Sequence, residues 1–250
     1  MPVRSDTELL SEIDRLRTQL EQGHADAAAR ERQLERYAAD LRESFKRERA
    51  QAEQLRRSYV ATVRALSNAV EARDAYTGKH AERVTAYGME VARAIGMSVD
   101  DGPELEFGFL LHDVGKVAVP DAILYKPAAL THSERALMEQ HPVIGSEIVR
   151  DIEFLAGAVP VVRSHHERWD GRGYPDRLSG EDIPLSARAF AVADVLDALT
   201  TDRPYRPASS FDVAREMITA GAGSHFDPRV VEVFTSIPDE TFLHIAAQLR

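Results

Sequence analysis

Residues 110–116 read LLHDVGK, an apolar stretch that ends in an adjacent histidine and aspartate, His112 and Asp113. On a helix, neighbouring side chains point about 100° apart. An imidazole and a carboxylate placed in this way can hold one metal ion from two sides, or the carboxylate can bridge to a second ion. The alternative is a His-Asp pair at a surface or a helix cap, so the choice depends on the rest of the chain.

Further metal-binding side chains recur along the chain, largely in stretches that are compatible with helices. Asp194 lies in AVADVLDALT, residues 191–200, an apolar run in which a carboxylate without a partner would be costly to bury. The chain has no cysteine, which excludes disulfides, thiolate nucleophiles and cysteine-bound zinc. Imidazole and carboxylate donors favour iron, manganese or zinc over magnesium or calcium. The candidate set is too large for one ion: His80, His112, Asp113, His141, His165, His166 and Asp194.

From about residue 70 onward, turn signals divide the chain into short segments with helical character. The breaks include Gly96, Pro142 and the glycine-rich loop at residues 171–175. Alternating strand patterns are hard to find in these segments. We therefore expect an all-α fold, in which a helical domain over residues 71–250 follows a separate segment over residues 1–70.

The N-terminal segment differs in composition from the rest, because residues 24–77 contain neither glycine nor proline and are rich in Ala, Glu, Arg, Leu and Gln. This composition predicts a long helix, of roughly 80 Å at about 1.5 Å per residue. Apolar residues at alternating steps of three and four predict a parallel, dimerising coiled coil. The alternative is one amphipathic helix folded back on its own domain, for which the helix is too long. The stripe begins at Leu9, Ile13, Leu16, Leu20, Ala27, Leu34, Tyr37 and Leu41.

Charge and hydropathy exclude several classes of protein. The formal net charge is −10, with +1 in residues 1–70 and −11 in residues 71–250, which argues against binding to a nucleic acid polymer. The N-terminus has no apolar signal-peptide core, and no apolar run is long enough for a membrane span. We expect a cytoplasmic protein.

Several motifs in a fixed order resemble the HD-GYP family, the cyclic-dinucleotide phosphodiesterase branch of the HD superfamily. The resemblance covers about residues 70–235. It rests on RDAYTGKHAERV, HDVGKVAVPDAILYKPAAL, HPVIGSEIV, HHERWDGRGYPDRLSGEDIP, ADVLDALTTDRPYR and GSHFDP. It implies an HD-GYP-type helical bundle with a metal cluster that activates a water or hydroxide to hydrolyse a phosphodiester of cyclic di-GMP.

The resemblance also implies a role for each ligand. Four residues should hold one divalent ion and three should hold the other, and Asp113 should bridge the two ions. The expected metal is iron or manganese. The first group is His80, His112, Asp113 and Asp194, and the second is His141, His165 and His166.

Four further residues are candidates for contact with the substrate. Lys116 could neutralise a nonbridging phosphate oxygen or protonate the leaving ribose oxygen, although it could also be a solvated helix residue. By resemblance, Arg203 and Arg206 bind the phosphates, for which a guanidinium is well shaped. Tyr174 could stack on guanine or contact a partner protein, or it could only pack the loop.

The expected product depends on Tyr76, which stands where relatives with a third metal carry a glutamate. By resemblance, a two-metal site stops at linear pGpG more often than it continues to GMP. The other open hypotheses are a phosphohydrolase of another nucleotide and a catalytically weak sensor of cyclic dinucleotides. The expected partners are a second copy of the chain and an upstream sensor protein or diguanylate cyclase.

Overall fold

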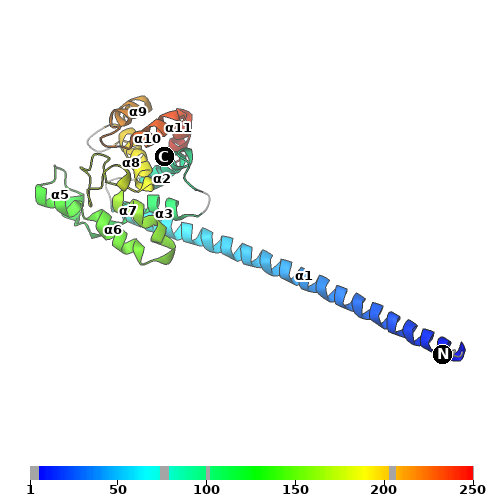
Figure 1. The fold of residues 1–250 in the computed structure, drawn as a ribbon. Coiled ribbons are helices and arrows are strands. Elements are labelled where there is room, and N and C mark those ends of the chain that lie inside the picture. Colours follow the sequence, from blue (N-terminus) through cyan, green and yellow to red (C-terminus); the bar gives the residue numbers. More distant parts are fainter. Residues whose placement is uncertain (1–5, 74–78, 100–101, 203–206, 250) are drawn as a thin grey trace. The chain divides into compact units, whose positions relative to one another are not determined.

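The computed structural model describes residues 6–73, 79–99, 102–202 and 207–249, and over these residues it contains helices and no strands (Figure 1). The predicted all-α fold is confirmed. The α-helices are α1 Asp6–Glu71, α2 His80–Ala94, α3 Glu104–Leu110, α4 Asp121–Leu124, α5 His132–Met138, α6 His141–Arg150, α7 Val159–Ser164, α8 Leu185–Thr200, α9 Phe211–Ala220, α10 Pro228–Ser236 and α11 Asp239–Gln248. Three 3₁₀-helices, η1 Val114–Ala118, η2 Glu153–Ala158 and η3 Gly180–Asp182, lie between them. None of the described helices has the length and apolar character that crossing a lipid bilayer requires.

The chain forms two compact units, Met1–Ser58 and Tyr59–Arg250. The first consists of most of α1, whose charged side chains pair along the helix, as in Arg15–Glu12 at 2.7 Å. The large apolar side chains of the predicted seam are exposed there: Leu9, Ile13, Leu16, Leu20, Leu34, Tyr37, Leu41, Phe45 and Leu55.

The long helix begins earlier and ends earlier than the glycine-free stretch predicts. It runs through Gly23 from Asp6 and stops at Glu71 instead of continuing to residue 77. The amide of Arg73 bonds to Val70 O at 3.0 Å, which tightens the last turn. The Arg73 side chain then bonds to Val117 O at 2.8 Å, which ties the chain just after the helix to η1.

The last turns of α1 belong to the second unit because they fill part of its core. Val63 is fully buried with Phe107 and Leu110 of α3, and the ring of Tyr59 stacks on Phe154 at 4.3 Å between centroids. Ser67 is buried one turn later. The structural boundary at residue 58 therefore precedes the division at residue 70 that the composition predicts.

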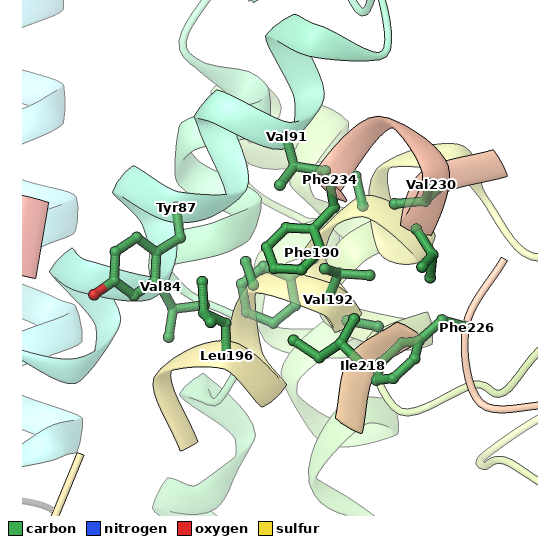
Figure 2. Close-up of a cluster of buried hydrophobic side chains, with 14 of the residues drawn as sticks. Val84, Tyr87, Val91, Phe190, Val192, Leu196, Ile218, Phe226, Val230 and Phe234 are labelled. Carbon is green, nitrogen blue, oxygen red and sulfur yellow. The ribbon is translucent and has the colours of Figure 1, made fainter. Parts of the chain in front are cut away.

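The larger core lies between α2 and α8 (Figure 2). Val84, Tyr87 and Val91 recur at helical spacing on α2 and face Phe190 and Leu196 of α8. Each such side chain contributes about 1.5–3 kcal/mol when it leaves water. This packing fixes the two helices that carry His80 and Asp194.

The regular helical spacing considered for His112 and Asp113 does not extend through LLHDVGK. Helix α3 ends at Leu110, and His112 and Asp113 lie in the turn that leads into η1. Gly115 explains the change, because a Cβ there would lie 1.9 Å from His141 O. The backbone approaches α6 so closely that only glycine fits, and this contact pulls Asp113 toward His141.

Candidate metal centre

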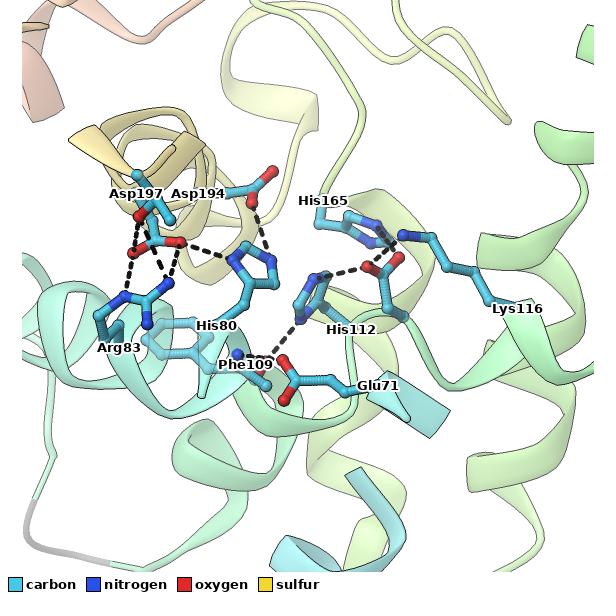
Figure 3. Close-up of polar contacts among 12 residues, drawn as sticks. Glu71, His80, Arg83, Phe109, His112, Lys116, His165, Asp194 and Asp197 are labelled. Atoms are coloured by element: carbon cyan, nitrogen blue, oxygen red, sulfur yellow. Dashed lines mark hydrogen bonds and ion pairs between the residues drawn. The ribbon is translucent and has the colours of Figure 1, made fainter. Parts of the chain in front are cut away.

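Two groups of side chains gather ligand atoms within 4.8 Å of one another. We call them the His80 group, which contains His80, His112 and Asp194, and the His141 group, which contains Asp113, His141, His165 and His166. Together they include all seven ligands that the sequence predicts. Figure 3 shows His80, Asp194, His112 and His165 converging from separate elements.

The His80 group is assembled from α2, α8 and the turn after α3. His80 is the first residue of α2, and its Nε2 lies 3.6 Å from Asp194 Oδ1 on α8. The rings of His80 and His112 meet edge to face, with centroids 5.6 Å apart. This group therefore depends on three elements that are distant in sequence.

The His141 group is assembled around α6 and the end of α7. His141 is the first residue of α6, while His165 and His166 follow α7 directly. His141 Nε2 lies 3.2 Å from His165 Nε2 and 3.2 Å from Asp113 Oδ1. His141 and His165 are almost completely buried.

Asp113 lies between the two groups. Its Oδ2 is 3.1 Å from His112 Nε2 in the His80 group, and its Oδ1 faces His141. Oδ1 is buried and accepts no hydrogen bond. A buried carboxylate oxygen without a hydrogen bond is costly unless something else compensates it. Its two oxygens thus face different groups, which is the geometry that a bridging ligand needs.

Four of the five histidines in these groups, all except His166, share one orientation, in which Nδ1 makes an outer contact and Nε2 points into the centre. Nδ1 of His112, His141 and His165 donates to the carbonyl oxygens of Phe109, Met138 and Val162, at 2.9, 2.8 and 3.0 Å. Nδ1 of His80 lies 2.7 Å from Asp197 Oδ2. In metalloproteins such outer contacts fix the tautomer and leave Nε2 as the ligand.

This orientation fits divalent metal ions. A neutral histidine whose Nδ1 carries the proton has a lone pair at Nε2. The Nε2 atoms of His141 and His165 face each other at 3.2 Å, and both also face the Asp113 carboxylate. A cation between these atoms satisfies the lone pairs and the buried oxygen together, so the residues present fit the metal that the sequence predicts.

The protonation states agree with this fit. Burial, and next the neighbouring His166 and His112, lower the pKa of His165 well below its usual value. Burial, with His141 beside it, lowers the pKa of His166 to about 3. Burial favours the neutral form of Asp113, but Lys116 and His112 outweigh it and hold the pKa of Asp113 well below its usual range. At neutral pH His165 and His166 are therefore neutral imidazoles and Asp113 is a carboxylate, as metal ligation requires. Burial disfavours the charged form of His112, but the neighbouring Asp113 outweighs it and raises the pKa of His112.

Comparison with known proteins agrees with the arrangement of ligands. Residues 64–230 match the model of the HD domain family. The chain belongs to this family, in its HD-GYP branch. This confirms the family resemblance.

Two relatives from Vibrio cholerae serotype O1 illustrate the range of this branch. A protein named cyclic di-GMP phosphodiesterase is 42% identical over 200 residues, which are 74% of this chain and 40% of that protein. A protein named 3′3′-cGAMP-specific phosphodiesterase 2 is 42% identical over 186 residues, which are 74% of this chain and 35% of that protein. The matched part of this chain thus spans well under half of the length of these relatives.

A solved structure supports the fold. A cyclic GMP-AMP specific phosphodiesterase of Vibrio cholerae, V-cGAP3, superposes with a TM-score of 0.55 at 21% identity, covering 74% of this chain and 52% of that one. The HD-GYP fold of the second unit is therefore shared with a structure of low sequence identity.

Lys116 lies beside the two ligand groups and pairs with Asp113. Its Nζ is 2.7 Å from Asp113 Oδ2, within η1 and not on the regular helix that the sequence predicts (Figure 3). An ammonium group at this position stabilises the charged form of Asp113 and stands next to the ligand atoms of both groups.

The glycine-rich loop at residues 171–175, which contains Gly173, Tyr174 and Pro175 and which we call the GYP loop, packs against the His141 group. The ring of Tyr174 lies 4.7 Å from that of His166 at 30°, and its amide donates to His166 O at 3.2 Å. A Cβ at Gly173 would lie 2.4 Å from Arg168 N, so glycine is required there. Glu167 helps to hold the loop by accepting from Asp176 N at 2.7 Å. A pocket beside the loop is lined by Glu139, Gln140, Gly171, Arg172, Gly173, Tyr174, Pro175 and Arg177.

Asp197 and Arg83 are site residues that the sequence predictions missed. Asp197 is 1% exposed, contacts His80 Nδ1 and accepts from Arg83 Nε at 2.7 Å. The sequence position of Asp197, three residues after Asp194 in the apolar run of α8, could have identified it, because a carboxylate buried there needs a partner. Arg83, one turn after His80, is that partner.

Three predicted residues lie outside the described part of the chain. They are Tyr76, Arg203 and Arg206. Their predicted roles stay predictions.

Proposed function

We propose that this protein is a metal-dependent phosphodiesterase that hydrolyses cyclic di-GMP to linear pGpG. The observation that carries the proposal is the convergence of two ligand groups on one partly buried carboxylate, Asp113, whose Oδ1 is buried. The names of relatives that share the HD-GYP signature support the substrate class. The proposal concerns this chain, which matches only part of those longer proteins.

In this proposal the His80 group and Asp113 hold one divalent ion, and the His141 group holds the second, with Asp113 shared. Iron or manganese is the expected metal, because imidazole and carboxylate donors suit either. When bound, two such ions would supply Lewis acidity toward a phosphodiester and toward a water molecule. No covalent intermediate on the protein is required.

The chain's own residues orient the substrate and move the proton. Lys116 Nζ, 2.7 Å from Asp113, neutralises a nonbridging phosphate oxygen or donates a proton to the leaving ribose oxygen. Tyr174 offers its ring to a guanine base at the rim of the His141 group. Arg203 and Arg206 bind the phosphates by bidentate hydrogen bonds. With Tyr76 in place of a third-metal glutamate, the reaction ends at pGpG.

A second substrate, 3′3′-cGAMP, is the alternative that the comparisons favour. The relative named for that nucleotide is as similar to this chain as the relative named for cyclic di-GMP, at 42% identity. Both substrates place a phosphodiester and a purine ring in the same geometry. The metal centre would therefore serve either one, and the base-contacting residues would select between them.

The exposed stripe of α1 supports a parallel homodimer that conveys a signal from an upstream sensor protein or a diguanylate cyclase. Replacing Leu20 and Leu34, both exposed at the seam, with aspartate should give a monomer in analytical ultracentrifugation. A dimer that persists in this variant would contradict the proposal.

The test of function is a product assay. The protein is purified without oxygen in the presence of Mn²⁺ or Fe²⁺ and incubated with cyclic di-GMP or 3′3′-cGAMP, and the products are separated by chromatography. We expect cyclic di-GMP to be converted to pGpG that accumulates. Onward conversion to GMP would contradict the proposed end point, and faster turnover of 3′3′-cGAMP would identify the alternative substrate. No turnover with two ions bound would contradict the enzymatic proposal and favour a sensor.

A further inference from the structure

The end of α1 reaches the first turn of α2, where the ligand His80 is located. The carboxylate of Glu71, the last residue of α1, accepts a hydrogen bond from the backbone N–H of Ala81 (Figure 3). Ala81 directly follows His80 and is buried. Glu71, His80 and His112 also line one pocket, together with Ser67, Val70, Ala81, Leu110, Leu111, Asp113, Val114 and Lys116.

Helix α2 lacks the local cap that usually stabilises a helix start. Its N-cap residue is Lys79, which has a positive φ of 58° and makes no side-chain capping hydrogen bond. The first N–H groups of any helix have no partner within the helix, and a carboxylate beside them is also favoured by the helix dipole. Glu71 supplies this acceptor and this charge from another helix. The start of α2, and with it His80, is therefore fixed by α1.

One turn earlier, α1 makes a second directed contact near the same ligand group. The hydroxyl of Ser67, which is 4% exposed, donates to Leu110 O at 2.8 Å. Leu110 ends α3, two residues before His112. The ion pair between Arg64 and Glu106 at 2.8 Å holds the same helix one turn further back. The last two turns of α1 thus bond to the first turn of α2, which contains His80, and to the end of α3, which leads to His112.

The His141 group is held differently. His141 and His165 are oriented by the carbonyl oxygens of Met138 and Val162, each three residues earlier in the same segment. Apolar packing from Val63 reaches Val162, but among the described contacts the directed hydrogen bonds of α1 lead to the His80 group. A change at the end of α1 should therefore affect the two groups unequally.

We propose that Glu71 is a positioning residue for His80 and that, with Ser67, it makes binding of the ion in the His80 group depend on the position of the last turns of α1. This inference rests on the proposed two-ion function and adds its regulation. Because α1 is one unbroken helix from Asp6 to Glu71, a displacement that reaches its end would loosen the His80 group first. The His141 group would keep its ion.

The test is a metal titration that needs no nucleotide. Full-length protein is freed of metal by chelation and titrated with Mn²⁺, and free Mn²⁺ is counted by electron paramagnetic resonance. We expect the unchanged protein to bind two ions. In Glu71→Ala, one ion should bind as before and the other about tenfold more weakly, the usual size for loss of an outer contact. Ser67→Ala should act in the same direction.

Two further variants separate positioning from general damage. Glu53→Ala removes an exposed glutamate of the same helix, which pairs with Arg56 at 3.3 Å, and should leave both affinities unchanged. Glu71→Gln keeps an acceptor oxygen for Ala81 N and should recover most of the lost affinity. If Glu71→Ala does not fold by circular dichroism, Glu71→Gln and Ser67→Ala decide the question by the same titration.

Three results would overturn the inference. Unchanged affinities in both Glu71→Ala and Ser67→Ala would refute the positioning role while the two-ion proposal stands. Equal weakening of both ions would refute the selective link to the His80 group. Fewer than two ions in the unchanged protein would contradict the two-ion proposal itself.

Discussion

The two ligand groups differ in how the chain holds them in place. In the His141 group, His141 and His165 are oriented by carbonyls of their own segments and are almost completely buried. In the His80 group, His80 is oriented by the side chain of Asp197 on α8, 117 positions away in sequence. Although Phe109 O orients His112 in the same local way, His80 depends on a contact between distant helices.

This difference indicates which of the two ligand groups can respond to a signal. A ligand held by the carbonyl of its own turn moves only if that turn unfolds. A ligand held by side chains of other helices moves when those helices shift. Asp113 faces both groups, so a change in Asp113 itself should affect both, whereas a shift of His80 alone should affect the His80 group.

The largest effect is expected from removing this shared ligand. Asp113→Ala should lose both ions and all turnover, because each group loses a donor and Lys116 loses its partner. Asp151→Ala, on an exposed residue, is the matched control and should behave as the unchanged protein. Elemental analysis that finds full metal occupancy in Asp113→Ala would refute the shared role of this carboxylate.

The next effect should be confined to the His80 group. Asp197→Asn removes the charge that orients His80 and should weaken one Mn²⁺ site by about 10- to 100-fold. It also leaves Arg83 buried without its carboxylate, at a cost of about 3–5 kcal/mol in stability. Arg83→Gln keeps the contact between Asp197 and His80, and should lower the melting temperature with a smaller loss of metal. If both variants weaken metal binding equally, the orienting role of Asp197 is wrong.

A smaller effect is expected at the rim of the His141 group. If Tyr174 stacks on a guanine base, Tyr174→Ala should raise KM by about tenfold, since such stacking contributes about 1–3 kcal/mol. Tyr174→Phe keeps the ring and should be nearly unchanged. Steady-state kinetics and metal analysis distinguish stacking on the substrate from packing of the loop. Loss of metal in Tyr174→Ala at constant KM would mean that the ring only packs against His166.

The smallest effect is a local pH dependence in α5, which precedes the His141 group. Hydrogen bonds from the Lys126 side chain at 2.5 Å and from the Thr131 backbone N–H at 2.7 Å lower the pKa of Glu134 to about 2. A lowered pKa adds stability above the ordinary glutamate pKa, and this stability is lost as pH falls toward 2. The difference in melting temperature between the unchanged protein and Glu134→Gln should therefore shrink from about pH 5 downward. A difference that is constant with pH would contradict this account.

The sequence predicted which side chains gather in one place better than it predicted the contacts that hold them there. His112, His165 and Asp194 could be recognised because they stand in motifs whose order and spacing are visible in one dimension. The turn at Asp113 was missed because it depends on a close approach between Gly115 and α6. The contacts of Glu71 and Asp197 were missed for the same reason, since each joins helices whose relative placement is set by packing.

The most direct test of the account is anomalous diffraction from crystals of the protein grown with Mn²⁺. We predict two peaks about 3.5–4 Å apart, one at the His80 group and one at the His141 group, with Asp113 between them. A single peak in crystals saturated with Mn²⁺, or two peaks that do not share Asp113, would contradict the two-ion centre on which the proposed phosphodiesterase depends.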